Sequence, residues 1–399
     1  MPSFMPSHTN SSHVTTLRAD AFTRTHGLSR HGLARVRAML RGTARAIAAT
    51  VAVASLAVAS GCSGSGAATT SSGASGLRKV TFMLSWAPDT NHIGVYVAKD
   101  RGYFAKEGLD VDIIAVSQAG AEQAVQNGQA DFALSNLTNV ADYSVKGASL
   151  TEVLQVQQKP SAIWCALASN TAITRPKDLD GKTFATFGSN EDDAVIKAMI
   201  RNDGGQGTFD KVTVGTSTFQ TLGSGQADFG GFYATWEGVQ AQMNGPQLTC
   251  FKEPDYGIPG NADSIGVITS NATISSDPDL VKAFVQATQR GYEYAYANPD
   301  EAAGILVRGA ADANLDEDFV KKSMQTIVDG GYWGDRDAIV AGTARVGQID
   351  YDGVQEYLDF LSQAGTYTDG NGGHVDADPQ VRQLAMDDYL AAAQPASEL

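Results

Sequence analysis

The chain is short of basic residues, and this shortage excludes one class of function. Lysine and arginine number 29 against 44 aspartates and glutamates in 399 residues, which gives a formal net charge of −15. Residues 1–61 hold seven arginines and one aspartate, so the remaining chain carries about −21. Nucleic-acid binding needs a basic face that this acidic body lacks, so we expect no nucleic-acid partner.

Histidine and cysteine are also scarce after residue 61. Only His92 and His374 of the six histidines lie there, which argues against a multi-histidine metal site. Cys165 and Cys250 could pair in an oxidising compartment or remain as two buried thiols, and the sequence leaves both open. No P-loop, dinucleotide-binding glycine motif, HExxH or nucleophile elbow is present. We therefore predict no catalytic residue, no cofactor and no metal.

An apolar run over residues 46–59 follows Arg41 and Arg45 and is too short to span a bilayer. We assign residues 1–61 to an export signal peptide, and Met39 is a second candidate for the true start. The run ends in Ala59-Ser-Gly-Cys62, which resembles a bacterial lipobox with alanine in place of the usual leucine. Cys62 would then be diacylated, and the alternative is an ordinary cleaved signal with an incidental cysteine.

Residues 62–77 are rich in Ser, Gly, Thr and Ala and have no apolar periodicity. Such a segment buries too little apolar surface to fold, so we predict a flexible tether. Together with two acyl chains on Cys62, the tether would hold the protein at the outer face of the cell membrane.

Strand and helix patterns alternate from Val80 onward, which predicts an α/β fold with mostly parallel sheets flanked by helices. The predicted strands are 80–84, 111–116, 130–134, 150–156, 162–168, 183–187, 212–214 and 263–269. The predicted long helices are 278–297, 299–309, 316–330 and 350–364. Two of them begin at Asp277-Pro278 and Asn298-Pro299, with proline at the first helical position.

A five-residue motif that occurs twice, called the echo below, predicts two lobes of like topology. Gly128-Gln-Ala-Asp-Phe132 recurs as Gly225-Gln-Ala-Asp-Phe229, each time between a helix pattern and a strand pattern. We assign 78–172 and 264–399 to lobe I and 173–263 to lobe II. The chain then crosses twice between the lobes, as a hinged clamp that closes on a ligand requires.

Polar and aromatic residues follow two predicted strands of lobe I. Trp86 could cover a core edge or stack on a flat heterocycle, with Asn91 and His92 beside it on the same loop, and we favour ligand contact. Ser135 and Asn136 end the strand 130–134, where they could cap the next helix or donate to a ligand.

The corresponding turn of lobe II is Phe187-Gly-Ser189-Asn-Glu191-Asp-Asp. Its backbone amides could form an anion cradle at a helix N-terminus, but the three acidic residues would repel an anion. Those acids could instead only complement the helix dipole. If one points inward, it suits an amino-bearing ring, and we select Glu191.

Aromatic residues cluster after the second copy of the echo. Phe232, Tyr233 and Trp236 do not alternate as a pure core strand would, so we predict that they face Trp86 across a cleft. Trp164 and Tyr256 are weaker candidates for the same cleft.

These segments resemble a family of transport proteins. The resemblance is carried by Trp86-x-Pro-x-x-Asn-His92, Gly94-Val-Tyr-Val-Ala98, Gly102-Tyr-Phe104, Gly128-Gln-Ala-Asp-Phe-Ala133, residues 173–182, Thr288–Ala295 and Asn298–Ala303. They are similar to the nitrate/sulfonate/taurine and thiamine-pyrimidine-precursor (SsuA/ThiY-like) superfamily of ABC importer solute-binding proteins. Within this superfamily, the Asn91-His92 loop and Tyr233-Ala-Thr-Trp-Glu237 are more similar to the branch that binds thiamine pyrimidine precursors.

The resemblance implies a hinged two-lobe periplasmic binding protein fold of type II. It implies a ring sandwiched by aromatics, with a carboxylate reading its amino group, and hydroxymethylpyrimidine or formylaminopyrimidine as the ligand. It also implies an ABC permease and ATPase as partners, and we expect a monomer. The chain after about residue 335 departs from the family pattern and adds little.

Two alternatives stay open. A sulfonate, taurine, nitrate or riboflavin receptor is one, although an anion receptor would want arginines that the candidate loops lack. The other is an enzyme, because fungal pyrimidine synthases share this fold and bind pyridoxal phosphate through a lysine. The matching place here holds Ser135, and their cysteine-rich segment has no counterpart.

Overall fold

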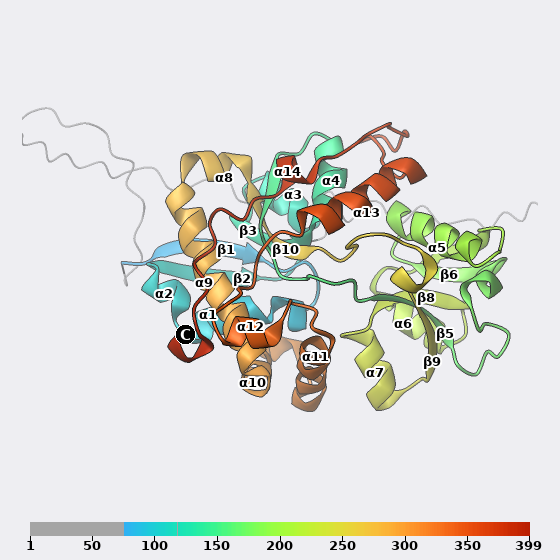
Figure 1. Ribbon diagram of the computed structural model, residues 1–399, viewed down its shortest axis with the longest axis horizontal. Helices are drawn as coiled ribbons and strands as arrows, with labels where there is room; N and C mark the ends of the chain where they lie inside the picture. Colours follow the sequence, from blue (N-terminus) through green and yellow to red (C-terminus); the bar gives the residue numbers. More distant parts are fainter. Residues whose placement is uncertain (1–75, 118) are drawn as a thin grey trace, which may run out of the picture. The chain divides into compact units, whose positions relative to one another are not determined.

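Two five-stranded mixed sheets form the centre of the structure, a computed structural model that describes residues 76–117 and 119–399 (Figure 1). All of these residues belong to one unit of the chain, Thr69–Leu399. The predicted signal peptide and Cys62 lie outside the described residues. No helix among the described residues is long and apolar enough to cross a membrane.

The first sheet has the strand order β2-β1-β3-β10-β4. β1 pairs in parallel with β2 and β3, whereas β10 runs antiparallel between β3 and β4. Its strands are β1 (Arg78–Met83), β2 (Leu109–Ile114), β3 (Phe132–Asn136), β4 (Leu150–Gln155) and β10 (Ile265–Ser270).

The second sheet repeats this arrangement with the order β7-β6-β8-β5-β9. β6 pairs in parallel with β7 and β8, and β5 runs antiparallel between β8 and β9. Its strands are β5 (Ala162–Leu167), β6 (Lys182–Thr186), β7 (Phe209–Thr213), β8 (Phe229–Tyr233) and β9 (Leu248–Lys252).

Strand β5 differs from the sequence-based expectation, which placed it in lobe I. It joins the second sheet, where Cys165 lies directly opposite Cys250 of β9 and the two form a disulfide. An apolar strand pattern shows that a strand exists but not which sheet it joins, because pairing partners lie far away in sequence. The disulfide, which the sequence left open, is therefore present.

The five-residue echo has a physical explanation in the two sheets. Asp131 accepts a hydrogen bond from the Thr81 amide at 2.8 Å, and Asp228 accepts one from the Thr183 amide at the same distance. Each aspartate precedes the third parallel strand of its sheet and anchors the central one, β1 or β6. The echo therefore marks equivalent positions in two lobes of like topology.

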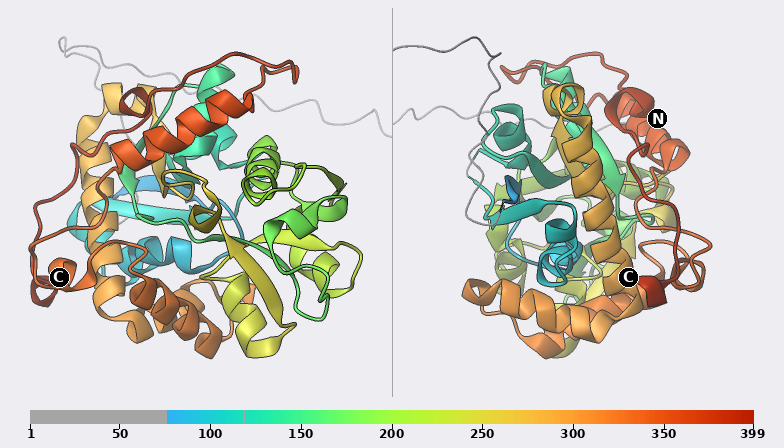
Figure 2. Two further views of the ribbon diagram at one scale, coloured as in Figure 1. Left: turned by 45° about the vertical axis from the view of Figure 1, so that its right-hand side comes forward. Right: turned by 90° about the vertical axis from the view of Figure 1, so that its left-hand side faces the viewer.

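Helices flank both sheets, and the longest, α9, runs alongside the first sheet (Figures 1 and 2). The α-helices are α1 (Ile93–Asp100), α2 (Tyr103–Lys106), α3 (Ala121–Gln126), α4 (Leu137–Val145), α5 (Asn190–Asn202), α6 (Thr218–Gly223), α7 (Glu237–Asn244), α8 (Asn271–Ser276), α9 (Pro278–Ala297), α10 (Pro299–Gly309), α11 (Glu317–Gly330), α12 (Arg336–Val340), α13 (Tyr351–Ala364) and α14 (Val381–Leu384). Short 3-10 turns are η1 (Thr90–His92), η2 (Pro176–Leu179), η3 (Gly215–Ser217), η4 (Pro254–Tyr256), η5 (Ala311–Ala313) and η6 (Ala396–Glu398).

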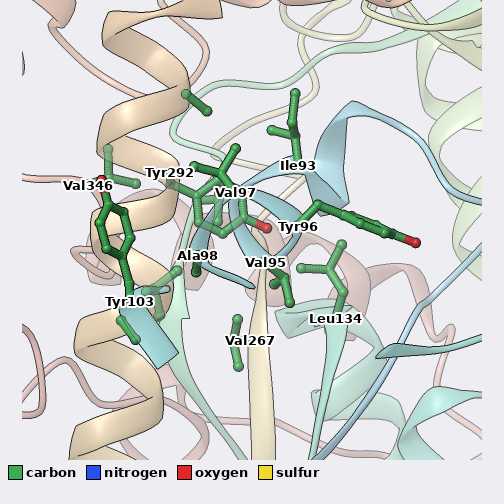
Figure 3. Close-up of a cluster of buried hydrophobic side chains, with 14 of the residues drawn as sticks. Ile93, Val95, Tyr96, Val97, Ala98, Tyr103, Leu134, Val267, Tyr292 and Val346 are labelled. Atoms are coloured by element: carbon green, nitrogen blue, oxygen red, sulfur yellow. The ribbon is translucent and has the colours of Figure 1, made fainter. Parts of the chain in front are cut away.

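Helices α1 and α9 approach each other closely at two glycines. A Cβ on Gly94 would lie 2.3 Å from the Tyr292 ring, and one on Gly291 would lie 2.0 Å from the Gly94 carbonyl oxygen. Figure 3 shows the Tyr292 ring of α9 among the α1 side chains, and its hydroxyl donates to the Asn91 carbonyl at 2.6 Å. The packing therefore fixes the loop that carries Trp86, Asn91 and His92.

One core side chain of the first sheet is ionisable and unpaired. Glu152 of β4 is fully buried, and neither carboxylate oxygen has a hydrogen-bond partner among the described residues. Burial raises the pKa of Glu152 well above its usual 4.5. Above pH 4.5 the folded protein therefore keeps Glu152 protonated, whereas the unfolded chain has released that proton.

Glu152→Gln should stabilise the protein near neutral pH. The stability that the protonated Glu152 contributes is fully present below about pH 4.5 and is lost as the pH rises toward its folded-state pKa. Glutamine stays neutral, so the gain in thermal midpoint should widen from about pH 5 to about pH 8. Glu356→Gln, which removes an exposed carboxylate from α13, is the control. A gain that does not change with pH would contradict this account.

Candidate ligand-binding site

A cavity of about 340 Å³ lies between the two sheets, at the ends of their parallel strands. Ten of the thirteen residues predicted to bind a ligand line it: Trp86, Asn91, Ser135, Asn136, Trp164, Phe187, Glu191, Phe232, Tyr233 and Trp236. Ligands of open α/β sheets bind at this end of the strands, which is why strand-end residues meet here. His92, Ser189 and Tyr256 do not line the cavity.

Two aromatic rings meet across the cavity. Trp86 follows β1 and Phe187 follows β6, and their ring centroids lie 5.3 Å apart in an edge-to-face contact. Phe187 remains 43% exposed, although it is a large apolar side chain. This pair therefore brings an aromatic group from each sheet to one cavity. The sequence analysis placed Phe232, Tyr233 and Trp236 opposite Trp86, whereas the ring in contact with it is Phe187.

His92 is fully buried beneath the first loop. Its Nε2 accepts the Ser85 amide hydrogen at 3.2 Å, its Nδ1 accepts the Asp89 amide hydrogen at 3.3 Å, and Asp89 Oδ1 lies 2.9 Å from the same Nδ1. Asp89 also accepts from the Asn91 amide at 2.8 Å. The imidazole thus holds the loop in shape, while Asn91 and Asp89 line the cavity.

The residues at the end of β3 are engaged by neighbouring protein groups. Ser135 Oγ donates to Glu122 Oε1 at 2.5 Å. Asn136 caps α4 by accepting from the Asn139 amide at 2.8 Å. Both residues also line the cavity, so the capping role and the position at the wall coexist.

Glu191 sits in the first turn of α5 and faces the cavity. Its two carboxylate oxygens accept hydrogen bonds from the Tyr357 hydroxyl at 2.8 Å and from Thr138 Oγ1 at 3.2 Å. Burial raises the pKa of Glu191 to about 7, and these two hydrogen bonds oppose that rise. The carboxylate is thus oriented by helices α4 and α13 while lying on α5.

The turn before α5 does not offer a free anion cradle. Ser189 Oγ caps the helix by accepting from the Glu191 and Asp192 amides at 3.1 and 3.4 Å. The Gly188 amide donates to Thr186 Oγ1 at 2.9 Å. Because these amides are already paired, the turn has little left to donate to an anion.

Three further aromatic residues that the sequence analysis selected divide between the cavity wall and packing elsewhere. Trp164 lies against Gly231, where a Cβ would stand 2.7 Å from the indole, so the glycine makes room for the ring. Trp236 packs edge-to-face on Phe319 of α11 at 4.5 Å. Tyr256 packs on Phe251 at 6.0 Å, away from the cavity.

Five acidic residues that the sequence analysis did not select also line the cavity: Asp89, Asp192, Glu237, Glu253 and Asp263. With Glu191 they make six carboxylates, and no lysine, arginine or histidine is among the described lining residues. Burial and the neighbouring acids raise the pKa of Asp192 to about 8. Such a wall offers acceptors and protonated carboxyls to a ligand, and none of its described residues supplies the fixed positive charge that would bind an anion.

Tyr357 of α13 is the lining residue that the sequence analysis missed most completely. The chain beyond about residue 335 was expected to add little, yet α13 lies over α4 and beside α5 and brings this hydroxyl to Glu191 (Figure 2). The apolar stripe of α13 signals a helix but does not tell which cavity it borders.

Relatives of the chain include both binding proteins and enzymes. A formylaminopyrimidine-binding protein of Halalkalibacterium halodurans is 31% identical over 244 residues, which cover 60% of this chain and 73% of the relative. A riboflavin-binding protein, RibY, of Chloroflexus aurantiacus is 25% identical over 250 residues, 60% of this chain and 68% of the relative. A 4-amino-5-hydroxymethyl-2-methylpyrimidine phosphate synthase of Candida albicans is 25% identical over 240 residues, 56% and 69% of the two chains.

Among solved structures, the alkanesulfonate-binding protein SsuA of Xanthomonas axonopodis pv. citri superposes with a TM-score of 0.59 at 12% identity. The likeness covers 77% of this chain and 98% of SsuA, and it confirms the predicted two-lobe periplasmic binding protein fold. Residues 89–302 match the family described as NMT1/THI5 like, and this match spans more than half of the chain. The chain therefore belongs to the NMT1/THI5-like family, within the SsuA/ThiY-like superfamily that its motifs resemble.

Proposed function

We propose that the protein is the extracytoplasmic substrate-binding lipoprotein of an ABC importer. It binds a small amino-bearing aromatic heterocycle, hydroxymethylpyrimidine or formylaminopyrimidine, between its two lobes and delivers it to the permease. The observation that carries the proposal is a cavity walled by aromatic rings and six carboxylates, with no basic residue among the described lining residues. The 31% identical formylaminopyrimidine-binding protein supports the same ligand class.

The aromatic wall suits a flat ring. Trp86, Phe187, Tyr233 and Trp236 come from both sheets, so closure of the lobes would bring rings onto both faces of a bound heterocycle. Glu191 would accept hydrogen bonds from the amino group of the ring. A carboxylate has about four lone-pair sites, and protein donors use only two of those on Glu191.

The same wall argues against an anionic ligand. A sulfonate or nitrate receptor needs fixed donors or cations, whereas the amides before α5 are already paired and no cation is among the described lining residues. Riboflavin, the ligand named for RibY, is uncharged and aromatic, so it remains the second candidate.

A binding role is favoured over catalysis. Some relatives are named as pyrimidine synthases, and the resemblance places their cofactor-binding lysine at the position that Ser135 occupies here. Ser135 instead donates to Glu122, which holds its hydroxyl in the wall of the cavity. An exported, lipid-anchored chain would also be separated from cytosolic pyridoxal phosphate.

A thermal-shift panel tests the ligand class. Hydroxymethylpyrimidine and formylaminopyrimidine should each raise the unfolding midpoint more than riboflavin, thiamine, taurine or nitrate do. A ligand present at a hundred times its dissociation constant adds about 2.7 kcal/mol of stability, which is easily measured. A shift with taurine or nitrate alone would show that the ligand assignment is wrong while leaving the fold intact.

Trp86→Ala should weaken pyrimidine binding at least tenfold, or about 1.4 kcal/mol. The variant removes one aromatic wall and its edge contact with Phe187, which exposes the ring to water. Trp86→Phe is the matched control, because it keeps a ring and should retain most of the affinity. Titration calorimetry measures all three proteins, and wild-type affinity in the alanine variant would assign Trp86 to packing.

Cys62→Ala should release the protein from the membrane fraction into the medium. The expectation follows from the lipobox-like Ala59-Ser-Gly-Cys62, since two acyl chains give stable anchoring and their loss leaves none. Mass spectrometry of the wild-type N-terminus provides the second readout. A wild-type protein without lipid would show that the signal is an ordinary cleaved one.

A further inference from the structure

Glu253 occupies an unusual position at the cavity. It follows β9 where the chain leaves the second sheet, and its side chain is only 2% exposed. Oε1 accepts a hydrogen bond from Trp164 Nε1 at 3.1 Å. Oε2 is buried and has no hydrogen-bond partner among the described residues, although Glu253 lines the cavity.

Two other acids of the wall, Asp263 and Glu191, are not among the buried groups without a partner. Asp263 accepts from the Ser161 amide, from Ser161 Oγ at 2.9 Å and from the Ala162 amide at 2.8 Å. Glu191 Oε1 accepts from the Tyr357 hydroxyl at 2.8 Å, and its Oε2 shares the Thr138 hydroxyl with Asn136 Oδ1. A buried carboxylate oxygen without a partner is costly, so Glu253 needs an external partner more than Asp263 or Glu191 does.

The groups that face Glu253 increase this need. Asp263 comes from the same crossover, Glu191 and Asp192 from α5, and the Tyr357 hydroxyl from α13. None of these groups is a cation, so none of them favours the ionised form of Glu253. A neutral donor would satisfy Oε2, but only a positive charge would also offset the repulsion among these carboxylates.

We propose that Glu253 binds an ammonium group of the ligand, so that the ligand is an aromatic ring carrying a protonated amine. The inference rests on the proposed function, because it places the ring in the same cavity, and it narrows the ligand class. Hydroxymethyl- and formylaminopyrimidine still occupy the same cavity through their ring and 4-amino group, and an aminomethyl substituent adds the contact with Glu253 and so binds more tightly. Trp164, which holds Oε1, is a positioning residue for Glu253.

Proton release accompanies this binding. Burial and the neighbouring carboxylates raise the pKa of Glu253 well above its usual range, so the empty site holds a proton there near neutral pH. An ammonium group beside Oε2 favours the ionised form and expels that proton. Affinity for the amine should therefore rise as the pH approaches the raised pKa of Glu253, while affinity for an uncharged ring should not.

Two isosteric probes test the inference directly. Calorimetry would compare 4-amino-5-hydroxymethyl-2-methylpyrimidine with its 5-aminomethyl analogue, in two buffers of different ionisation enthalpy to count released protons. The aminomethyl ring should bind at least tenfold more tightly and release protons. Equal affinities, or tighter binding of the hydroxymethyl ring, would overturn the inference.

Substitutions at Glu253 and at Glu191 distinguish the contributions of these two carboxylates to binding of the two probes. Glu253→Gln keeps the shape and an acceptor for Trp164, and it should reduce the preference for the amine to about one. Glu191→Gln should weaken both probes by similar factors and leave the preference in place. Glu356→Gln on the exposed face of α13 removes the same charge and should change neither affinity. A preference that survives Glu253→Gln would overturn the assignment.

The remaining outcomes are also decisive. If Glu253→Gln does not fold, Glu253→Asp withdraws the charge by one methylene and should lower the preference; an unchanged preference overturns the assignment. If neither pyrimidine binds, the proposed function is wrong, and benzylamine against benzyl alcohol then tests the ammonium site alone by the same criterion. Calcium that binds wild type but not Glu253→Gln would assign the site to a metal ion and overturn the organic class.

Discussion

The hydrogen bonds to the Asp263 carboxylate join the two segments by which the chain passes between its sheets. Asp263 lies just before β10, and its partners Ser161 and Ala162 lie at the start of β5. β10 and β5 are the antiparallel strands inserted into the first and second sheet. One carboxylate therefore sets where each sheet receives a strand from the opposite direction, and the cavity between the sheets depends on it.

Elements with local determinants could be predicted from the sequence. Helices α9 and α10 begin at Pro278 and Pro299 and end where the sequence indicates, because caps and proline act within one turn. Membership of β5 in the second sheet, by contrast, is decided by residues more than 60 positions away, such as Cys250 opposite Cys165. A pattern read over ten residues has no access to such a pairing.

The same difference between local and long-range determinants applies to the residues of the cavity. Trp86, Phe187 and Glu191 were found because each follows a predicted strand, and strand ends converge. His92 and Ser189 stand at equally suggestive positions, but each satisfies a nearby backbone or loop group instead of the cavity. Glu253 and Tyr357 were missed because their role arises only from tertiary contacts, with Trp164 and Glu191 respectively.

The contribution of α13 bears on the order in which the cavity is completed. Every other lining residue lies between Ser85 and Ile265, and Tyr357 comes more than 90 residues later. The strands of both sheets and the rest of the wall therefore all precede, along the chain, the group that orients Glu191. A chain without α13 would keep every strand and every other lining residue, yet it would lose both the hydroxyl that orients Glu191 and the buried α13 side chains that pack in the same core cluster as α4 and α5.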